Sequence, residues 1–365
     1  MNILWNLDGT IFDTFPTLKA AYSDMNHFTN SANDFLEHVQ TSKNAELGNT
    51  KLSSEEKSTF WRIENAHPVT EKPPFAFVDQ VMNVANKNFL VTHRNRASTI
   101  ALLKHWRLYD YFYEIICLPD DEHPTKPNVS SYNYLHKRYG INLVIGSREL
   151  DLLPARELQI KTCSFQNKKI HADFHLNTYQ DFPVVLLSLE FYVDYGTKNI
   201  RVTPSLLKKL LADDENRLEH ALQVALKDND SPESILLTIG YAKSLQRTKF
   251  YPLDGALFAS ELGLGYKVIL PILFHSLSFG ERMDTEHPHY IFYKKCSHFI
   301  DSNIKKKIDW LTYCELTTSP AGINLPIKER IKQLLRKHVN DNRVYQNIEK
   351  MNYYFEELEE RFGDK

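Results

Sequence analysis

Ile3-Leu4-Trp5-Asn6-Leu7-Asp8-Gly9-Thr10-Ile11-Phe12-Asp13-Thr14 is the stretch that decides the fold of this chain. It begins with an apolar run and passes into a polar turn that contains one glycine. This pattern is typical of a buried strand that ends in a turn. Open α/β sheets bind ligands in the crevice at the carboxyl ends of their strands. We therefore expect the polar residues of this turn to line a site.

The same stretch resembles the opening motif of the haloacid dehalogenase superfamily, which usually reads Asp-x-Asp-Gly-Thr-x-x-Asp. One position departs from that motif, because Asn6 stands where the family has the aspartate that accepts the phosphoryl group. The resemblance makes Asn6 and Asp8 catalytic positions. It implies that Asp8 acts as the acid and base and lies among the metal ligands.

Two further segments resemble the second and third motifs of that family. The apolar segment Asn88 to Arg94 places Thr92 where the family has a hydroxyl that binds a phosphate oxygen. Lys126 precedes a proline and a predicted helix, as does the family's lysine, which neutralises the phosphate. From the sequence, His93 and Arg94 either line the mouth of the pocket or lie in a surface loop.

The segment Leu143 to Asp151 resembles the fourth motif, Gly-Asp-x-x-x-Asp. Its glycine is present, and Asp151 matches the second acid. Ser147 replaces the first acid, which is a direct magnesium ligand in the family. The resemblance therefore leaves Asp8 and Asp151 as the residues expected to bind Mg²⁺, with weak or absent binding if the site is degenerate.

The resemblance covers roughly residues 1–168 and is closest to the phosphoglycolate-phosphatase-like branch. The alternation of predicted strands and helices favours an α/β fold, a doubly wound parallel sheet. A small helical cap is expected as an insertion at about residues 14–80. His27, His38 and His67 lie in that insertion, and solvated positions are the more common interpretation of such histidines.

Residues 169–365 resemble no family that we recognise, and we expect a second, helix-rich α+β domain there. The apolar segment Val184 to Val193 fits either a strand pair or a buried helix. Glu286, His287 and His289 form a cluster that could suggest a metal site. Their spacing matches no firm metal-binding motif, so a solvated loop is the favoured interpretation. The expected helices are Pro204 to Leu226, a helix that begins at Ser231, Ile304 to Leu311, Pro326 to Val339 and Val344 to Phe362.

The composition narrows the possible classes of protein. A chain of 365 residues suggests two domains, and a net charge of −2 gives no general attraction to nucleic acid or membrane. No apolar run approaches the ~20 residues that span a bilayer. Four scattered cysteines, none of them at metal-ligand spacing, are typical of reduced thiols in a cytoplasmic protein.

The two substitutions lead to one main hypothesis about function. An amide at position 6 cannot form an aspartyl-phosphate, and a hydroxyl at Ser147 is a poor ligand for a hard cation. We therefore predict a catalytically impaired phosphatase-fold protein that binds a small phosphate-containing ligand or a protein partner.

Two alternatives stay open. One is an active Mg²⁺-dependent phosphatase of small phosphate esters that carries altered residues or uses unusual ligands, and an engineered Asn6 that traps substrate is one form of it. That change does not explain Ser147, so two losses at one metal site favour natural degeneration. The other is an adaptor that acts through residues 170–365, where a basic segment with neighbouring aromatic residues makes nucleic acid a possible but less favoured partner.

Overall fold

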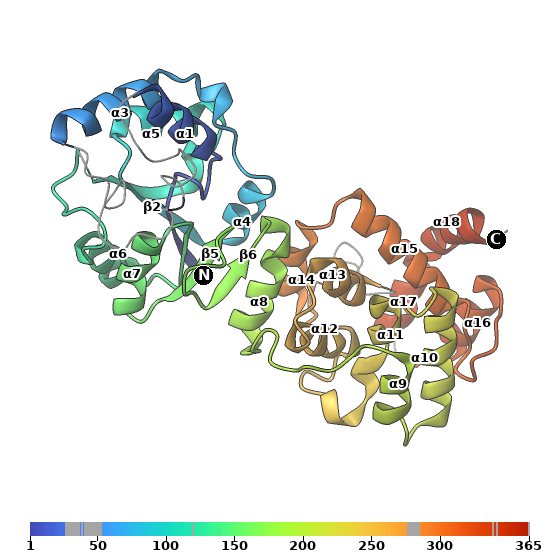
Figure 1. Cartoon of the computed structure of the whole chain (residues 1–365). Helices are drawn as coiled ribbons and strands as arrows, with labels where there is room; N and C mark the ends of the chain where they lie inside the picture. Colours follow the sequence, from blue (N-terminus) through green and yellow to red (C-terminus); the bar gives the residue numbers. More distant parts are fainter. Residues whose placement is uncertain are drawn as a thin grey trace. The chain divides into compact units, whose positions relative to one another are not determined.

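A computed structural model of the chain forms two compact units, Met1–Gln180 and Asp181–Lys365 (Figure 1). Of the residues singled out in the sequence, His27 and His38 lie outside the part that the structure describes. The described residues are 1–25, 37, 39, 53–118, 120–275, 285–337, 339–340 and 342–363.

The first unit contains a six-stranded sheet with the order β3-β2-β1-β4-β5-β6. All neighbouring strands are parallel, which confirms the expected doubly wound sheet. The first strand lies at the centre, where Leu4 pairs with Phe89 on one side and Val144 on the other. The strands are β1 Asn2–Trp5, β2 Lys87–Thr92, β3 Phe112–Cys117, β4 Leu143–Gly146, β5 Lys161–Phe165 and β6 Phe174–Leu176.

Apolar side chains from alternate strand positions build the core on one face of the sheet. Leu4, Phe89 and Val144 contribute to it from the three central strands. Helices α6 (Ser130–Tyr139) and α7 (Glu149–Glu157) cover this face and are drawn beside each other in Figure 1. The second of these helices begins close to the end of β4.

Two helices of the expected cap pack together through a small core of their own. They are α1 (Phe15–Asp24) and α3 (Ser54–Ala66), and Phe60 is fully buried between them. A capping box, in which Ser53 and Glu56 bond each other's backbone, starts α3. The unit is completed by α4 (Val78–Val84) and α5 (Arg96–His105).

The second unit consists of helices in its described part, with one isolated bridge between Thr318 and Asn324, so the few strands that we expected are not found there. The apolar segment at 184–193 belongs to a buried helix, which decides between its two interpretations. The helices are α8 Phe182–Phe191, α9 Pro204–Leu210, α10 Glu215–Lys227, α11 Pro232–Leu236, α12 Tyr251–Glu261, α13 Tyr266–Phe274, α14 Tyr290–Ser297, α15 Ser302–Leu316, α16 Ile327–Lys337, α17 Asn342–Lys350 and α18 Asn352–Phe362.

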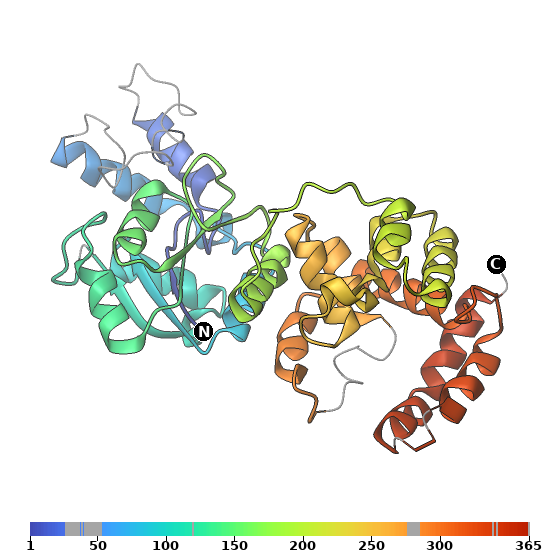
Figure 2. The ribbon, with the colours of Figure 1, turned by 90° about the horizontal axis from the view of Figure 1, so that it is seen from below.

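Two of the predicted helices are each divided in two. Residues 204–226 form α9 and α10, because the Asp214 side chain accepts a hydrogen bond from Arg217 N–H and starts a new helix. Residues 344–362 lie in α17 and α18, which meet at the buried residue Met351. Together with α16 these helices form one group around a shared apolar core, drawn in red in Figure 2.

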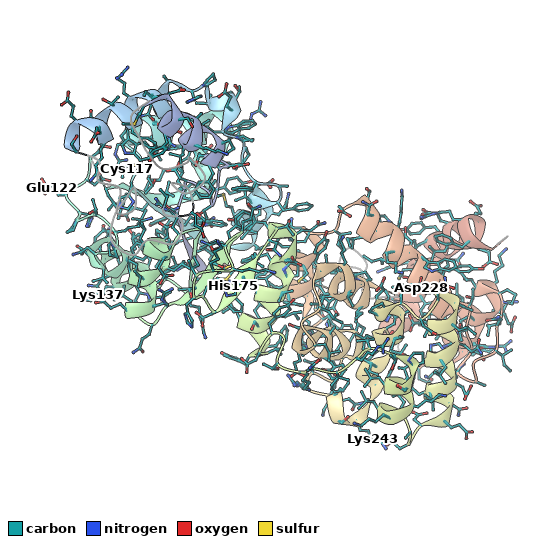
Figure 3. All side chains as sticks on the ribbon, viewed as in Figure 1. Cys117, Glu122, Lys137, His175, Asp228 and Lys243 are labelled. Carbon is teal, nitrogen blue, oxygen red and sulfur yellow. The ribbon has the colours of Figure 1, made fainter. Side chains whose placement is uncertain are left out.

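Polar contacts also hold this unit together. Asp228, labelled in Figure 3, accepts hydrogen bonds from the Lys307 ammonium and the Trp310 indole.

Within the described ranges, no helix has the length and apolar character needed to cross a bilayer. The four cysteines are buried free thiols.

Candidate functional site

The sheet brings the predicted site residues to one edge. Asn6 follows β1, Thr92 ends β2 and Ser147 follows β4, so parallel pairing places all three at the carboxyl ends of neighbouring strands. Asp151 reaches the same place from the first turn of α7, and Lys126 from the segment before α6. Each of these side chains is buried.

Hydrogen bonds fix the orientation of the Asn6 amide. Its Oδ1 accepts a hydrogen bond of 2.9 Å from the Lys126 ammonium, which has only donors. Its Nδ2 donates to the backbone carbonyl of Asp8 at 2.9 Å, and a carbonyl can only accept. Both partners therefore assign the same orientation. An aspartate in this place would direct a second oxygen at the Asp8 carbonyl.

Ser147 points at the same carbonyl oxygen. Its hydroxyl donates to the backbone oxygen of Asp8 at 3.2 Å. The two positions where the resemblance expects acids thus both carry donors, and Asn6 and Ser147 donate to one oxygen atom. The two substitutions are coupled by this geometry.

The Asp8 carboxylate is bound to a buried arginine. Arg94 donates to Asp8 Oδ1 from Nη2 at 2.7 Å and from Nε at 3.1 Å. The same guanidinium donates to both carboxylate oxygens of Glu64, which comes from the cap helix α3. Burial opposes the charge of Arg94, but the two carboxylates raise its pKa. Glu64 also pairs with the buried Lys72 at 3.0 Å.

A second ionic group surrounds Asp151, which is fully buried. Lys126 donates to its Oδ1 at 2.9 Å, and Arg148 donates to both of its oxygens. Burial alone would raise the pKa of this carboxyl, but Arg148 and Lys126 lower it to about 2. Burial also lowers the pKa of Lys126 itself, against the opposing effect of Asp151. Asp151 is therefore ionised and bonded to two cations.

Several donors at this edge have no acceptor in the described part of the chain. The backbone N–H groups of Leu7 and Asp8 donate no hydrogen bond there. The Lys126 ammonium has three protons and uses two of them. His93 accepts from Lys126 N–H through Nε2, so its Nδ1 carries the proton, and this buried atom has no partner either. Burial also lowers the pKa of His93 well below its ordinary value.

Not every predicted residue contacts the ionic groups. The Thr92 hydroxyl accepts a hydrogen bond from Arg94 N–H at 3.1 Å, which shapes the turn after β2. His67 pairs with Glu71 instead of facing the site. Residues 285–337 near the acidic and histidine cluster hold no group of three or more metal-binding side chains, and neither do the other described ranges.

The sequence did not identify four charged residues of the ionic groups, namely Lys72, Arg94, Glu64 and Arg148. Arg94 was considered only for a pocket mouth or a surface loop, yet it is completely buried. Glu64 gave no signal, because a single acid in a polar helix is ordinary. Arg148 did give a signal that was overlooked, since it directly follows Ser147 and precedes Asp151 by three residues, a spacing that lets the two side chains meet at the start of a helix.

The residues present do not fit a magnesium ion. Hard cations need oxygen ligands that are not already bonded to other donors, and Mg²⁺ needs these oxygens in octahedral geometry. Here the Asp8 carbonyl oxygen receives two donors, and both oxygens of Asp151 receive bonds from Arg148. Cations and donors of the protein therefore occupy the Asp8 carbonyl oxygen and both carboxylate oxygens of Asp151.

The family model described as haloacid dehalogenase-like hydrolase matches residues 3–165. The chain matches no protein that has a curated description.

Solved structures that resemble the chain include three hydrolases. A hydrolase from Streptococcus pneumoniae TIGR4 is 21% identical, with a TM-score of 0.32, over 44% of this chain and 90% of that one. A haloacid dehalogenase-superfamily hydrolase from Geobacter sulfurreducens PCA is 17% identical, with a TM-score of 0.38, over 50% and 96%. A predicted phosphoglycolate phosphatase from Haemophilus somnus 129PT is 16% identical, with a TM-score of 0.40, over 50% and 96%.

The opening motif, the parallel sheet and the family match over the same residues lead to one conclusion. Residues 3–165 of this chain match the haloacid dehalogenase-like hydrolase family and form its parallel α/β sheet.

Proposed function

We propose that the N-terminal domain is a catalytically impaired member of its family that binds a phosphate-containing ligand without magnesium. One observation carries this proposal. Asn6 and Ser147, which stand at two positions of family acids, both donate hydrogen bonds to the Asp8 carbonyl oxygen. A change at one position alone would not build this arrangement, so it supports a site that has been rebuilt around donors.

The loss of catalysis follows from the chemistry of the amide. A carboxylate attacks phosphorus because it is charged and nucleophilic, and the Asn6 amide is neither. Its oxygen is also bonded to Lys126 and its nitrogen to the Asp8 backbone. Position 6 therefore has no nucleophilic carboxylate that could form an aspartyl-phosphate.

The charge of the site favours an anion. The connected ionic groups contain three carboxylates, Asp8, Glu64 and Asp151, against four cations, so one positive charge remains (four minus three). The four cations are Lys72, Arg94, Lys126 and Arg148. A phosphate that approaches the turn after β1 meets the backbone N–H groups of Leu7 and Asp8, which suits a nest for an oxyanion.

Calorimetry with inorganic phosphate in EDTA tests the proposal. We expect saturable binding without magnesium, weakened about tenfold or more in Lys126→Met, because a charge-assisted bond in a buried site is lost. The matched control is Lys137→Met, which removes an exposed lysine of α6, labelled in Figure 3. Binding that requires magnesium, or equal loss in both variants, would contradict the proposal.

A hydrolysis assay separates this proposal from an active phosphatase. We expect no turnover of an aryl phosphate by the unaltered chain, with or without magnesium. Magnesium-dependent turnover that Asp8→Asn abolishes would mean that the chain is a working phosphatase and that Asn6 does not prevent catalysis. We keep a partner-binding role of the second domain as a further proposal. Proteolysis tests whether the chain divides near Lys168-Lys169, as we expected, or between the two compact units, at Gln180 and Asp181.

A further inference from the structure

A polar cluster in the second unit lies outside everything described so far. Its centre is Glu315 on α15, which accepts a hydrogen bond of 3.0 Å from the hydroxyl of Tyr251 on α12. His275, at the end of α13, lies 3.2 Å from the same hydroxyl through its Nε2. Three helices that are far apart in the sequence therefore direct polar groups to one place in the interior of the unit.

Beside this centre, an arginine packs against one of two stacked tyrosine rings. The rings of Tyr241 and Tyr251 stack with centroids 4.0 Å apart and an angle of 16° between their planes. The guanidinium of Arg217, from α10, lies 3.5 Å from the Tyr241 ring centroid. Such stacking fixes the plane of the guanidinium and leaves its edge available for an acceptor.

A second arginine, Arg330 on α16, is close enough to interact electrostatically with Glu315, Arg217 and both tyrosines. Neither arginine forms an ion pair with a carboxylate in the described ranges. The Nε of Arg330 is buried without an acceptor there, and its one side-chain hydrogen bond, to Gln333, is 3.5 Å long. Burial lowers the pKa of Arg330, and the charge of Arg217 lowers it further, against Glu315.

Glu315 has an unused acceptor of its own. Its Oε2 is buried and accepts no hydrogen bond within the described part of the chain. The nearest cationic candidate is His275 Nε2 at 3.6 Å, beyond hydrogen-bond distance. The other ring nitrogen, Nδ1, lies 2.6 Å from the Ile272 carbonyl and must donate to it. Within the described ranges the cluster thus contains a buried donor without an acceptor, Arg330 Nε, and a buried acceptor without a donor, Glu315 Oε2.

We propose that Arg217, Arg330 and Glu315 form a binding site for a protonated phosphate group, either free hydrogen phosphate or the singly ionised form of a phosphate monoester. The arginines donate to its charged oxygens, and Glu315 Oε2 accepts the proton of its P–OH group. Arg217, Tyr241 and Arg330 are only partly buried, so the group can be reached from solvent. The ligand satisfies the buried polar atoms that the chain leaves without partners.

The carboxylate makes this site selective between oxyanions. Hydrogen phosphate carries an O–H group near neutral pH, whereas sulfate carries none. Sulfate would therefore place an oxygen lone pair against the unpaired Glu315 Oε2. A site built from arginines alone would accept both ions, so the comparison of phosphate with sulfate reports on the carboxylate.

Calorimetry on the full chain tests the proposal with inorganic phosphate and sulfate as probes. We expect one class of phosphate sites that Arg330→Gln weakens at least tenfold and that sulfate occupies at least tenfold more weakly. The matched control is Lys332→Gln, which removes an exposed charge from the same helix. Because this pair differs only in the second unit, phosphate bound by the first unit affects both variants equally.

A reversal variant makes the test sharper. Glu315→Gln keeps an acceptor for Tyr251 and adds a donor, so we expect its preference to move toward sulfate by about tenfold. Equal phosphate binding in Arg330→Gln and Lys332→Gln would overturn the proposal, as would equal affinity for the two ions in Lys126→Met, the variant that weakens the phosphate site proposed for the first unit. If Arg330→Gln does not fold by circular dichroism, Arg217→Gln replaces it with the same expectation. Tighter binding of glycerol phosphate than of inorganic phosphate at about pH 5.5, below the monoester's second pKa of about 6, would identify a monoester as the ligand.

Discussion

Arg94 in the first unit and Arg330 in the second show two opposite uses of a guanidinium away from solvent. Arg94 is completely buried and donates to two carboxylates, Asp8 and Glu64. Arg330 is partly buried and pairs with no carboxylate in the described ranges. The first arrangement holds elements of its unit together. The second leaves the positive charge of Arg330 for a bound anion to neutralise. The comparison teaches that burial of an arginine identifies neither role until its partners are counted.

Replacement of Arg94 should give the largest effect. Arg94→Met leaves Asp8 and Glu64 without their shared cation, and removal of one partner of a buried ion pair lowers the free energy of unfolding by about 3–5 kcal/mol. Urea denaturation measures this change. The control is Arg96→Met, because Arg96 pairs with Asp121 at the surface, where such a pair contributes about 0–1 kcal/mol. Equal losses in the two variants would remove the distinction between a buried and an exposed pair.

The ionic group around Asp151 should make stability depend on acid. The folded pKa of about 2 lies below the ordinary value of 3.8, so the stabilisation is present above pH 4 and is lost as the pH falls toward 2. This carboxylate should contribute about 2 kcal/mol, from about 1.4 kcal/mol for each pKa unit. Unfolding in urea at several pH values measures it. Asp151→Asn should flatten the curve in that window, and an unchanged curve would show that Asp151 is not the group responsible.

The Asn6 amide should resist exchange for a carboxylate. Asn6→Asp replaces the donor that faces the Asp8 carbonyl by an acceptor, which we expect to lower the free energy of unfolding by about 1–2 kcal/mol. Asn95→Asp is the control, because Asn95 caps α5 through its oxygen and aspartate caps equally well. If magnesium restores the stability of Asn6→Asp, the carbonyl of Asp8 can still hold a cation and our interpretation of the metal site is wrong.

Replacement of Arg330 should give the smallest effect and is the sharpest contrast with Arg94. Because Arg330 has no carboxylate partner, Arg330→Gln should change the free energy of unfolding by no more than about 0.5 kcal/mol, in either direction. Urea denaturation without phosphate measures this change. Saturating phosphate should then stabilise the unaltered chain more than the variant. A loss as large as that of Arg94→Met would show that Arg330 is structural.

The sequence was sufficient for the architecture of the first unit and for the turns that meet at its candidate site. Strands that end in polar turns are local signals, and parallel pairing then fixes which turns meet. It was not sufficient for the ion pairs, because Arg94 and Glu64 are thirty residues apart and meet only after the cap helix packs. In the second unit the breaks at residues 211–214 and at Met351 depend on capping and on packing, which helical periodicity does not report.

The bridge from Arg94 to Glu64 also opposes any movement of the cap helix α3 away from the sheet. Glu64 belongs to α3, so movement of that helix away from the sheet must separate the pair. If this separation costs about 4 kcal/mol, only about one molecule in a thousand is open at any moment, and the apparent affinity for a ligand that enters by this route falls by the same factor. A ligand that binds Arg94 itself would compete with Glu64 and shift the population toward the open state. The cap helix would then behave as an inhibitor carried in the same chain, present at a concentration that dilution cannot lower.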